Sequence, residues 1–387
     1  MTTSLARYRQ LAPSAAVRVS PICLGAMTFG SKHNERYGKC DKETSFSILD
    51  AFYESGGNFI DTANTYREGE SEEWVGEWMA SRGNRDEIVL ATKYTNPARP
   101  PRSEKSIEVN MIGNNLKSMR LSIDASLKRL QTSYIDLFYV HVWDYTTSIP
   151  ELMHGLNDLV VSGKVLYLGI SDTPAWIVTK CNEYARQNSL RGFAVYQGMW
   201  SAVMRDFERE IIPMAIHEGM ALCPYGTLNQ GRFQTREGFK QRDEAEKNGT
   251  HEGRNFIPTS ERDRAVSAVL EDLASARGDE TTLLQVALAY VLHKAPYVFP
   301  LVGARKVEHL TGNFPALDLA LSEEELERID GAYEFEHGFP SDFLCGSLFQ
   351  PGQKSKMVAH PSQVWLTAKP NFEYVEGVKP IRPKEKK

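Results

Sequence analysis

The sequence predicts a (β/α)8 TIM barrel with an N-terminal hairpin and a long C-terminal loop or tail. Two observations favour this fold class. Short apolar runs recur eight times along the chain, and stretches with helical spacing lie between them. The runs have continuous apolar cores, which is typical of strands buried on both faces of a parallel sheet.

The first predicted element is a hairpin, in which YRQL and VRVS flank a turn at Pro13-Ser14 and alternate apolar with polar residues. The barrel strands are expected at residues 22–26, 58–63, 87–94, 134–142, 166–171, 193–199, 221–226 and 298–304. Asp41 is a good N-cap for a first helix that Gly56 would end. Residues 281–295 are almost wholly apolar and predict a helix wedged against the barrel.

Two stretches do not follow the strand and helix alternation. Residues 232–258 are polar and rich in charge, and we expect a long loop there. Residues 331–387 contain Pro, Gly and aromatic residues without periodicity. We expect one domain over residues 1–387, with the barrel at about 18–328 and both additions near the mouth of the active site, where the second would shape specificity.

Composition excludes several function classes. The chain has 387 residues, of which 41% are hydrophobic, and a net charge of −5, so a nucleic-acid surface is not expected. No apolar stretch approaches the roughly 18 residues of a membrane span, and the N-terminus lacks a signal-peptide pattern. The five cysteines are widely spaced without a CxxC pair, which predicts free thiols, no metal site and a cytoplasmic location. The sequence predicts no particular oligomeric state.

Four residues that can move protons stand at successive strand ends. Asp61 and Tyr66 lie in NFIDTANTY, Lys93 lies in IVLATKY, and His141 lies in DLFYVHV. Taken singly, each is more often a cap, a hydrogen-bonded structural residue or a solvated charge. Because a parallel barrel carries its chemistry at the carboxyl ends of its strands, the four together favour an active site.

The segments DTANTY, TKY, YVHV and GISD resemble the aldo-keto reductase superfamily from about Arg18 to about Arg328. ARYRQLAP, GISDTPAW and GFPSDFLCG are most similar to its fungal aryl-alcohol dehydrogenase branch, which includes norsolorinic acid reductase-like enzymes of aflatoxin and sterigmatocystin biosynthesis. The resemblance implies NADPH-dependent reduction of an aldehyde or ketone, or oxidation of the alcohol.

The resemblance assigns a role to each member of the tetrad. Tyr66 would protonate the oxygen after hydride transfer, and Lys93 would lower the pKa of that phenol. Asp61 would hold Lys93 in place, and His141 would orient the carbonyl through a ring N–H.

The resemblance also implies the residues that bind NADPH or NADP+. These are Ser171, Asp172, Gln197 and Tyr225 for the nicotinamide, and Arg305, Lys306, His309 and Asn313 for the 2′-phosphate and adenosine. Asp172 replaces the usual Asn, so it accepts from the carboxamide NH2 but does not donate to its oxygen. Gly312 replaces a commonly acidic residue, so that one adenine contact is in question.

An aromatic small molecule is the expected substrate. Met27 and Phe29 in the first βα loop, and Trp143 and Trp200 just after strands, are candidates to line its pocket, although packing between loops is the alternative. One rival function is an NADPH-binding regulatory or sensor subunit with little turnover. A second is a short-chain dehydrogenase, whose glycine fingerprint and Tyr-x-x-x-Lys helix do not occur as a coherent pair.

Overall fold

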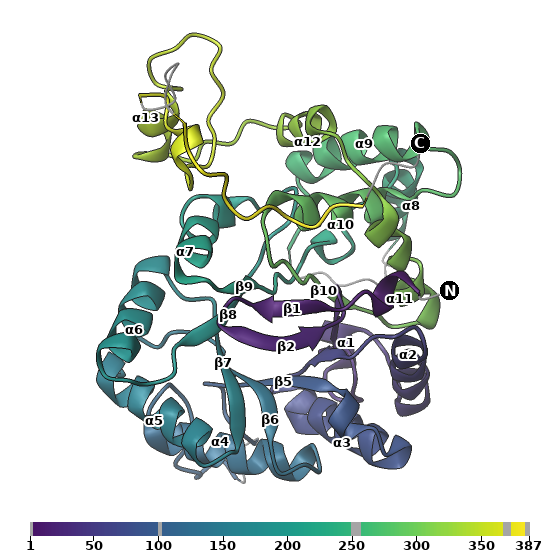
Figure 1. The fold of residues 1–387 in the computed structure, drawn as a ribbon. Coiled ribbons are helices and arrows are strands. Elements are labelled where there is room, and N and C mark those ends of the chain that lie inside the picture. Colours follow the sequence, from purple (N-terminus) through teal and green to yellow (C-terminus); the bar gives the residue numbers. More distant parts are fainter. Residues whose placement is uncertain (1–2, 100–102, 249–256, 367–372, 384–387) are drawn as a thin grey trace.

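Eight parallel strands form a curled sheet in the computed structural model, which describes residues 3–99, 103–248, 257–366 and 373–383 (Figure 1). Each predicted run overlaps one of them, and β7 begins one residue before its run: β3 (Cys23–Gly25), β4 (Phe59–Asp61), β5 (Val89–Tyr94), β6 (Ile135–Val140), β7 (Val165–Ser171), β8 (Phe193–Gln197), β9 (Ala221–Leu222) and β10 (Leu301–Gly303). Leu222 of β9 also pairs in parallel with Val298, just before β10. This contact joins the two edges, so the predicted (β/α)8 barrel is confirmed.

Helices lie between the strands and after the last one, and most of them cover the outside of the barrel, as a parallel sheet requires. They are α1 (Asn34–Tyr37), α2 (Lys42–Glu54), α3 (Glu70–Arg82), α4 (Leu116–Arg129), α5 (Ile149–Val161), α6 (Ala175–Gln187), α7 (Ile211–Glu218), α9 (Glu261–Ser275), α10 (Leu283–Lys294), α11 (Val307–Thr311) and α12 (Glu323–Asp330). Asp41 caps α2 as predicted, because its side chain accepts from the backbone N–H of Thr44 at 2.8 Å. None of the helices in the described ranges is long and apolar enough to cross a membrane.

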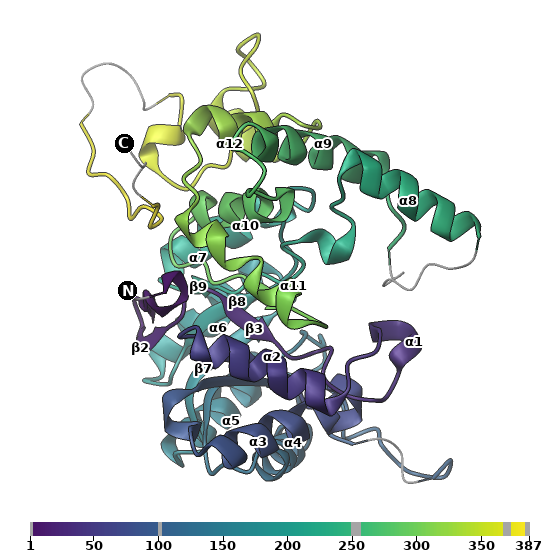
Figure 2. The same cartoon turned by 90° about the vertical axis from the view of Figure 1, so that its right-hand side faces the viewer.

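The predicted hairpin consists of β1 (Arg9–Ala12) and β2 (Ala15–Val19) and lies across one end of the barrel (Figure 1). Its residues Leu11 and Val19 are fully buried in one cluster with barrel residues such as Phe59 and Tyr139. In Figure 2 the hairpin lies at one side of the barrel, and α1 and α8 lie at the opposite side. The hairpin therefore closes the end of the barrel at which the strands begin.

The stretch 232–258 is not the long loop that we expected, because α8 (Arg236–Lys247) forms in it. This helix is polar around most of its circumference and buries Phe239, over which the guanidinium of Arg264 lies at 4.5 Å from the ring centre. Arg264 also pairs with Asp243 at 2.6 Å. Contacts of charged side chains with α9 therefore stabilise α8, although its sequence lacks the apolar periodicity by which a helix is recognised.

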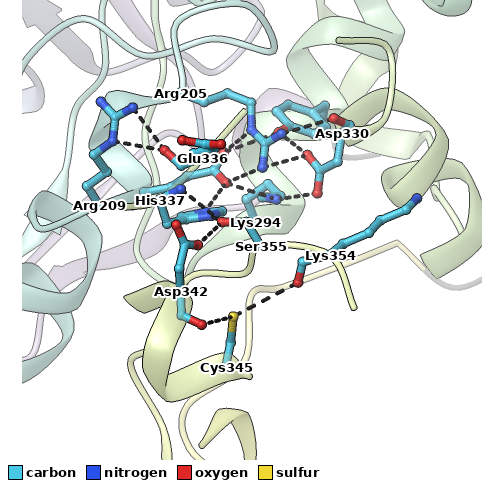
Figure 3. A network of polar contacts seen from close by, with 12 residues as sticks. Arg205, Arg209, Lys294, Asp330, Glu336, His337, Asp342, Cys345, Lys354 and Ser355 are labelled. Carbon is cyan, nitrogen blue, oxygen red and sulfur yellow. Dashed lines mark hydrogen bonds and ion pairs between the residues drawn. The ribbon is translucent and has the colours of Figure 1, made fainter. Parts of the chain in front are cut away.

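The C-terminal extension contains α13 (Ser341–Cys345) and is tied to the barrel by a polar network (Figure 3). His337 lies 3.5 Å from the buried carboxylate of Glu208, which Arg205 holds at 2.7 Å. The other ring nitrogen of His337 contacts Ser355 at 2.7 Å, and Ser355 donates to Asp342 at 2.5 Å. These contacts fix the start of the extension against the segment that leads into α7.

The expected position of this extension at the active-site mouth is wrong for its described part. None of its described residues lines the cavity presented below. Near its end, Arg382 pairs with Glu323 of α12 and donates to the backbone oxygen of His293 on α10 at 3.1 Å. The extension instead covers the flank of the barrel, because its few polar anchors have their partners on that flank.

Candidate active site

A cavity of about 430 Å³ lies at the carboxyl ends of the strands. It is lined by Gly25, Met27, Thr28, Arg36, Tyr37, Asp61, Tyr66, His141, Ser171, Asp172, Gln197, Met199, Tyr225, Gly226, Gln230, Ile257, Leu301 and Gly303. The volume is in the range of small-molecule sites. Three of the four predicted catalytic residues line it directly.

Lys93, the fourth residue, lies beneath this surface and is fully buried. Its ammonium forms an ion pair with Asp61, donates to the backbone oxygen of Thr62 at 2.7 Å, and lies 3.4 Å from the hydroxyl of Tyr66. The second carboxylate oxygen of Asp61 accepts from the amide of Gln197 at 3.0 Å. The sequence-predicted group therefore does come together, with Lys93 in contact with both Asp61 and Tyr66.

The electrostatics of this group are set by burial and by the paired charges. Desolvation lowers the pKa of Lys93, but the charges of Asp61 and Tyr66 outweigh it, and the pKa is raised. Burial raises the pKa of Asp61, opposed by Lys93. We therefore assign a charged ammonium to Lys93 across the neutral range, with an ionised Asp61 as its partner.

The pKa of Tyr66 differs from the expectation that Lys93 would bring it below its ordinary value. Burial raises the pKa, Lys93 lowers it, and the net shift without substrate is upward. The phenol is therefore protonated and can donate its proton. The adjacent ammonium would stabilise the phenolate that donation leaves behind.

His141 is a neutral imidazole with a defined tautomer. Burial and the nearby Lys93 lower its pKa to about 3. The amide nitrogen of Asn96 lies 3.3 Å from Nδ1 of His141, and an amide nitrogen only donates. Nδ1 is therefore the acceptor, so that Nε2 carries the ring hydrogen and can donate to a carbonyl oxygen.

Arg67 is a buried residue of the site that the sequence did not single out. Its guanidinium donates to the backbone oxygens of Thr28, at 2.9 Å, and Gly38, at 2.7 Å, and to the side chain of Asn34 at 3.0 Å. A side chain at Gly30 would lie 2.4 Å from Cβ of Arg67 at a backbone φ of +143°, so this turn requires glycine. Arg67 thus fixes the conformation of the first βα loop through these hydrogen bonds. That loop contributes Met27, Thr28, Arg36 and Tyr37 to the cavity. The sequence gives no signal for this role, because an Arg before a helix usually faces solvent.

The predicted nicotinamide residues Ser171, Asp172, Gln197 and Tyr225 all line the cavity. The hydroxyl of Tyr225 lies 3.2 Å from both carboxylate oxygens of Asp172. Hydrogen-bonding groups beside an aromatic ring, with Gly25 and Gly303 also in the cavity wall, fit a flat ring that carries an amide.

The predicted phosphate and adenosine residues follow β10. Arg305 is half-buried and Lys306 is exposed. A Cβ at Gly38 would lie 2.3 Å from Nη1 of Arg305, so Gly38 leaves the space that the guanidinium occupies. His309 is exposed, and desolvation together with Arg305 and Lys306 lowers its pKa. Asn313 is buried, and its amide donates to the backbone oxygen of His309 at 2.6 Å.

Three of the four predicted substrate residues do not line the cavity. Met27 lines it, but Phe29 and Trp200 are fully buried, and Trp200 stacks on Phe207 with ring centres 5.7 Å apart. Trp143 packs against the core and contacts Tyr145. These three aromatic residues pack against neighbouring side chains, as the alternative to a substrate role expects. Tyr37, Met199, Gln230 and Ile257 are lining residues that the sequence did not indicate.

Comparison with known proteins agrees with this geometry. The Aldo/keto reductase family matches residues 21–334. The chain is 62% identical to norsolorinic acid reductase B of Aspergillus parasiticus over 99% of this chain and 100% of that protein. It is 51% identical to norsolorinic acid reductase A of the same fungus, over 98% of this chain and 94% of that protein. It is 49% identical to the aryl-alcohol dehydrogenase (NADP(+)) of Phanerodontia chrysosporium, over 87% of this chain and 89% of that protein. The resemblance stated from the motifs is confirmed.

Proposed function

Because the chain belongs to the aldo/keto reductase family, we propose that it reduces an aryl ketone or aldehyde with NADPH, or oxidises the matching alcohol with NADP+. The observation that carries this proposal is the Tyr66 hydroxyl, which lines the cavity 3.4 Å from the buried ammonium of Lys93. The names of these relatives favour norsolorinic acid or another aryl compound as the substrate. The resemblance to the fungal branch favours an aromatic polyketide in a pathway of the aflatoxin or sterigmatocystin type.

The side chains perform the proton chemistry of this reaction. A bound NADPH would supply hydride to the carbonyl carbon. Tyr66 and Nε2 of His141 would bind the carbonyl oxygen, which places the oxygen between two hydrogen-bond donors. As negative charge develops on that oxygen, Tyr66 gives up its proton. Lys93 then stabilises the phenolate, and Asp61 keeps Lys93 charged and in place.

The residues of this chain that would hold the cofactor form two groups. Ser171, Asp172, Gln197 and Tyr225 would bind the nicotinamide end in the cavity. Arg305 and Lys306 would bind the 2′-phosphate, since a guanidinium matches phosphate through two parallel hydrogen bonds. His309 and Asn313 would then lie beside the adenosine.

The experiment is NADPH oxidation at 340 nm by the purified chain with a panel of aromatic ketones and aldehydes, beside Tyr66→Phe. We expect turnover in the wild type and a kcat at least about 100-fold lower in the variant, with NADPH affinity nearly unchanged. Loss of NADPH binding in Tyr66→Phe would contradict its role as proton donor. Tight NADPH binding by the wild type without turnover of any carbonyl would favour a regulatory subunit instead.

A further inference from the structure

Asp172 is a second carboxylate in the cavity, and its surroundings differ from those of Asp61. It directly follows β7, and its backbone N–H donates to the backbone oxygen of Gln197 at 3.1 Å. Its backbone φ is +43°, a conformation that aspartate adopts more readily than most residues. Asp172 is thus held at the cavity wall by the adjacent strand end.

The side chain of Asp172 contacts a neutral partner. Asp61 is paired with the ammonium of Lys93, whereas the carboxylate of Asp172 accepts from the phenol of Tyr225. Burial raises the pKa of Tyr225, so the phenol stays protonated and neutral. Asp172 is exposed and lines the cavity, so a ligand in the cavity would displace the water that reaches its carboxylate.

We infer that Asp172 places a negative charge beside the nicotinamide and thereby makes the chain bind NADP+ more tightly, relative to NADPH, than a neutral residue would. This inference rests on the proposed function. The nicotinamide ring carries a positive charge in NADP+ and none in NADPH, so a nearby carboxylate distinguishes the two forms. Asp172 would also stabilise the positive charge that appears on the ring when hydride leaves, which favours reduction of a bound carbonyl.

The protonation state of Asp172 is consistent with this role. Burial raises its pKa to about 6, and Tyr225 and Lys93 oppose the rise. The carboxyl is therefore ionised at pH 8. Protonation at lower pH would remove the charge that the inference requires.

The size of the cavity sets the expected effect. Taken as a sphere, a volume of about 430 Å³ has a diameter of about 9 Å, so a ring inside it lies within roughly that distance of Asp172. At an effective dielectric constant of about 20, two unit charges about 9 Å apart change a ratio of affinities by about 20-fold. A measurable shift is therefore expected from one charge.

The test compares dissociation constants for NADP+ and NADPH at pH 8, measured by quenching of tryptophan fluorescence. Asp172→Asn keeps the shape of the side chain and removes its charge. We expect the ratio of the NADPH to the NADP+ dissociation constant to fall by about 20-fold. Asp124→Asn on α4, which removes an exposed carboxylate that pairs with Lys164 just before β7, is the matched control and should leave the ratio unchanged.

Tyr225→Phe provides a second, independent variant. It removes the hydroxyl that donates a hydrogen bond to the Asp172 carboxylate but keeps the ring. The ratio of the NADPH to the NADP+ dissociation constant should therefore rise. A ratio within about twofold of the wild type in an Asp172→Asn chain that still binds both cofactors would overturn the inference alone. A wild-type chain that binds neither cofactor would overturn the proposed function and the inference with it.

Discussion

Replacing Lys93 by Met removes the cation at the centre of the site. The side chains of Lys93 and Asp61 are 0% and 2% exposed, and the remaining partner of Asp61 is the amide of Gln197 at 3.0 Å. Lys93→Met therefore leaves a nearly buried carboxylate without its cation. Removing one partner of a buried ion pair costs about 3–5 kcal/mol, and we expect that loss in the free energy of unfolding at pH 8.

A second substitution separates this charge effect from lost packing. Asp61→Asn in the same chain removes the unpaired charge, keeps the shape of the side chain and can still contact Gln197. We expect Lys93→Met/Asp61→Asn to recover at least about 2 kcal/mol of the loss, because two neutral groups of suitable size are tolerated where one unpaired charge is not. Neither variant should regain turnover, since Tyr66 has lost its adjacent ammonium.

The pH dependence provides an internal check. Without Lys93, the pKa of Asp61, which burial already raises from 3.8, rises further. The folded state then binds a proton that the unfolded state releases, so the stability of the variant falls as pH rises above about 4. The free energy of unfolding of Lys93→Met should therefore lie closer to the wild-type value at pH 5 than at pH 8.

The assay is unfolding in urea followed by tryptophan fluorescence at both pH values, with the m-values compared. A single variant within about 1 kcal/mol of the wild type at pH 8 would refute the reasoning, since a buried pair of this kind is worth more. A double variant less stable than the single one would refute it as well.

Three further predictions concern the cofactor and His141. Arg305→Ala should weaken NADPH binding at least about tenfold more than NADH binding in fluorescence titrations, because a bidentate phosphate contact is lost; equal weakening would contradict the phosphate assignment. Asn96→Asp should lower kcat by about 10–100-fold at nearly unchanged melting temperature, because a carboxylate accepts from Nδ1 and takes the hydrogen from Nε2. Nitrogen NMR shifts of His141 that stay at wild-type values in this variant would count against the tautomer argument. Because the pKa of His141 is lowered in the folded state, the imidazole takes up a proton in the unfolded chain at a higher pH than in the folded one. The free energy of unfolding therefore decreases as the pH falls below 6.5. Between pH 7 and pH 5 the wild type should lose about 1–2 kcal/mol more stability than His141→Gln, and equal losses would show that His141 titrates normally.

The barrel and the tetrad were predictable because their signals are local. Each strand has a continuous apolar run, and the end of that run places the next polar residue at the shared edge of the sheet. Asp61, Lys93 and His141 therefore had to lie near one another once the strands were recognised. Tyr66 follows β4 by only a few residues and shares that constraint.

The aromatic residues and the two additions were harder because their positions depend on distant contacts. Trp200 follows a strand closely, but its partner Phe207 keeps it in the core and out of the cavity. Helix α8 lacks an apolar stripe, so nothing in its own sequence distinguishes it from a charged loop. The extension is anchored by His337, whose partner Glu208 is more than a hundred positions earlier in the chain.

The hairpin of β1 and β2 has a kinetic consequence for the proposed reaction. Because Leu11 and Val19 seal one end of the barrel, cofactor and substrate would have to enter and leave at the other end. When two ligands share one entrance, the ligand nearer the strand ends is covered by the one nearer the opening. Steady-state kinetics should then show a compulsory sequence, in which the inner ligand is the first to bind and its product is the last to leave.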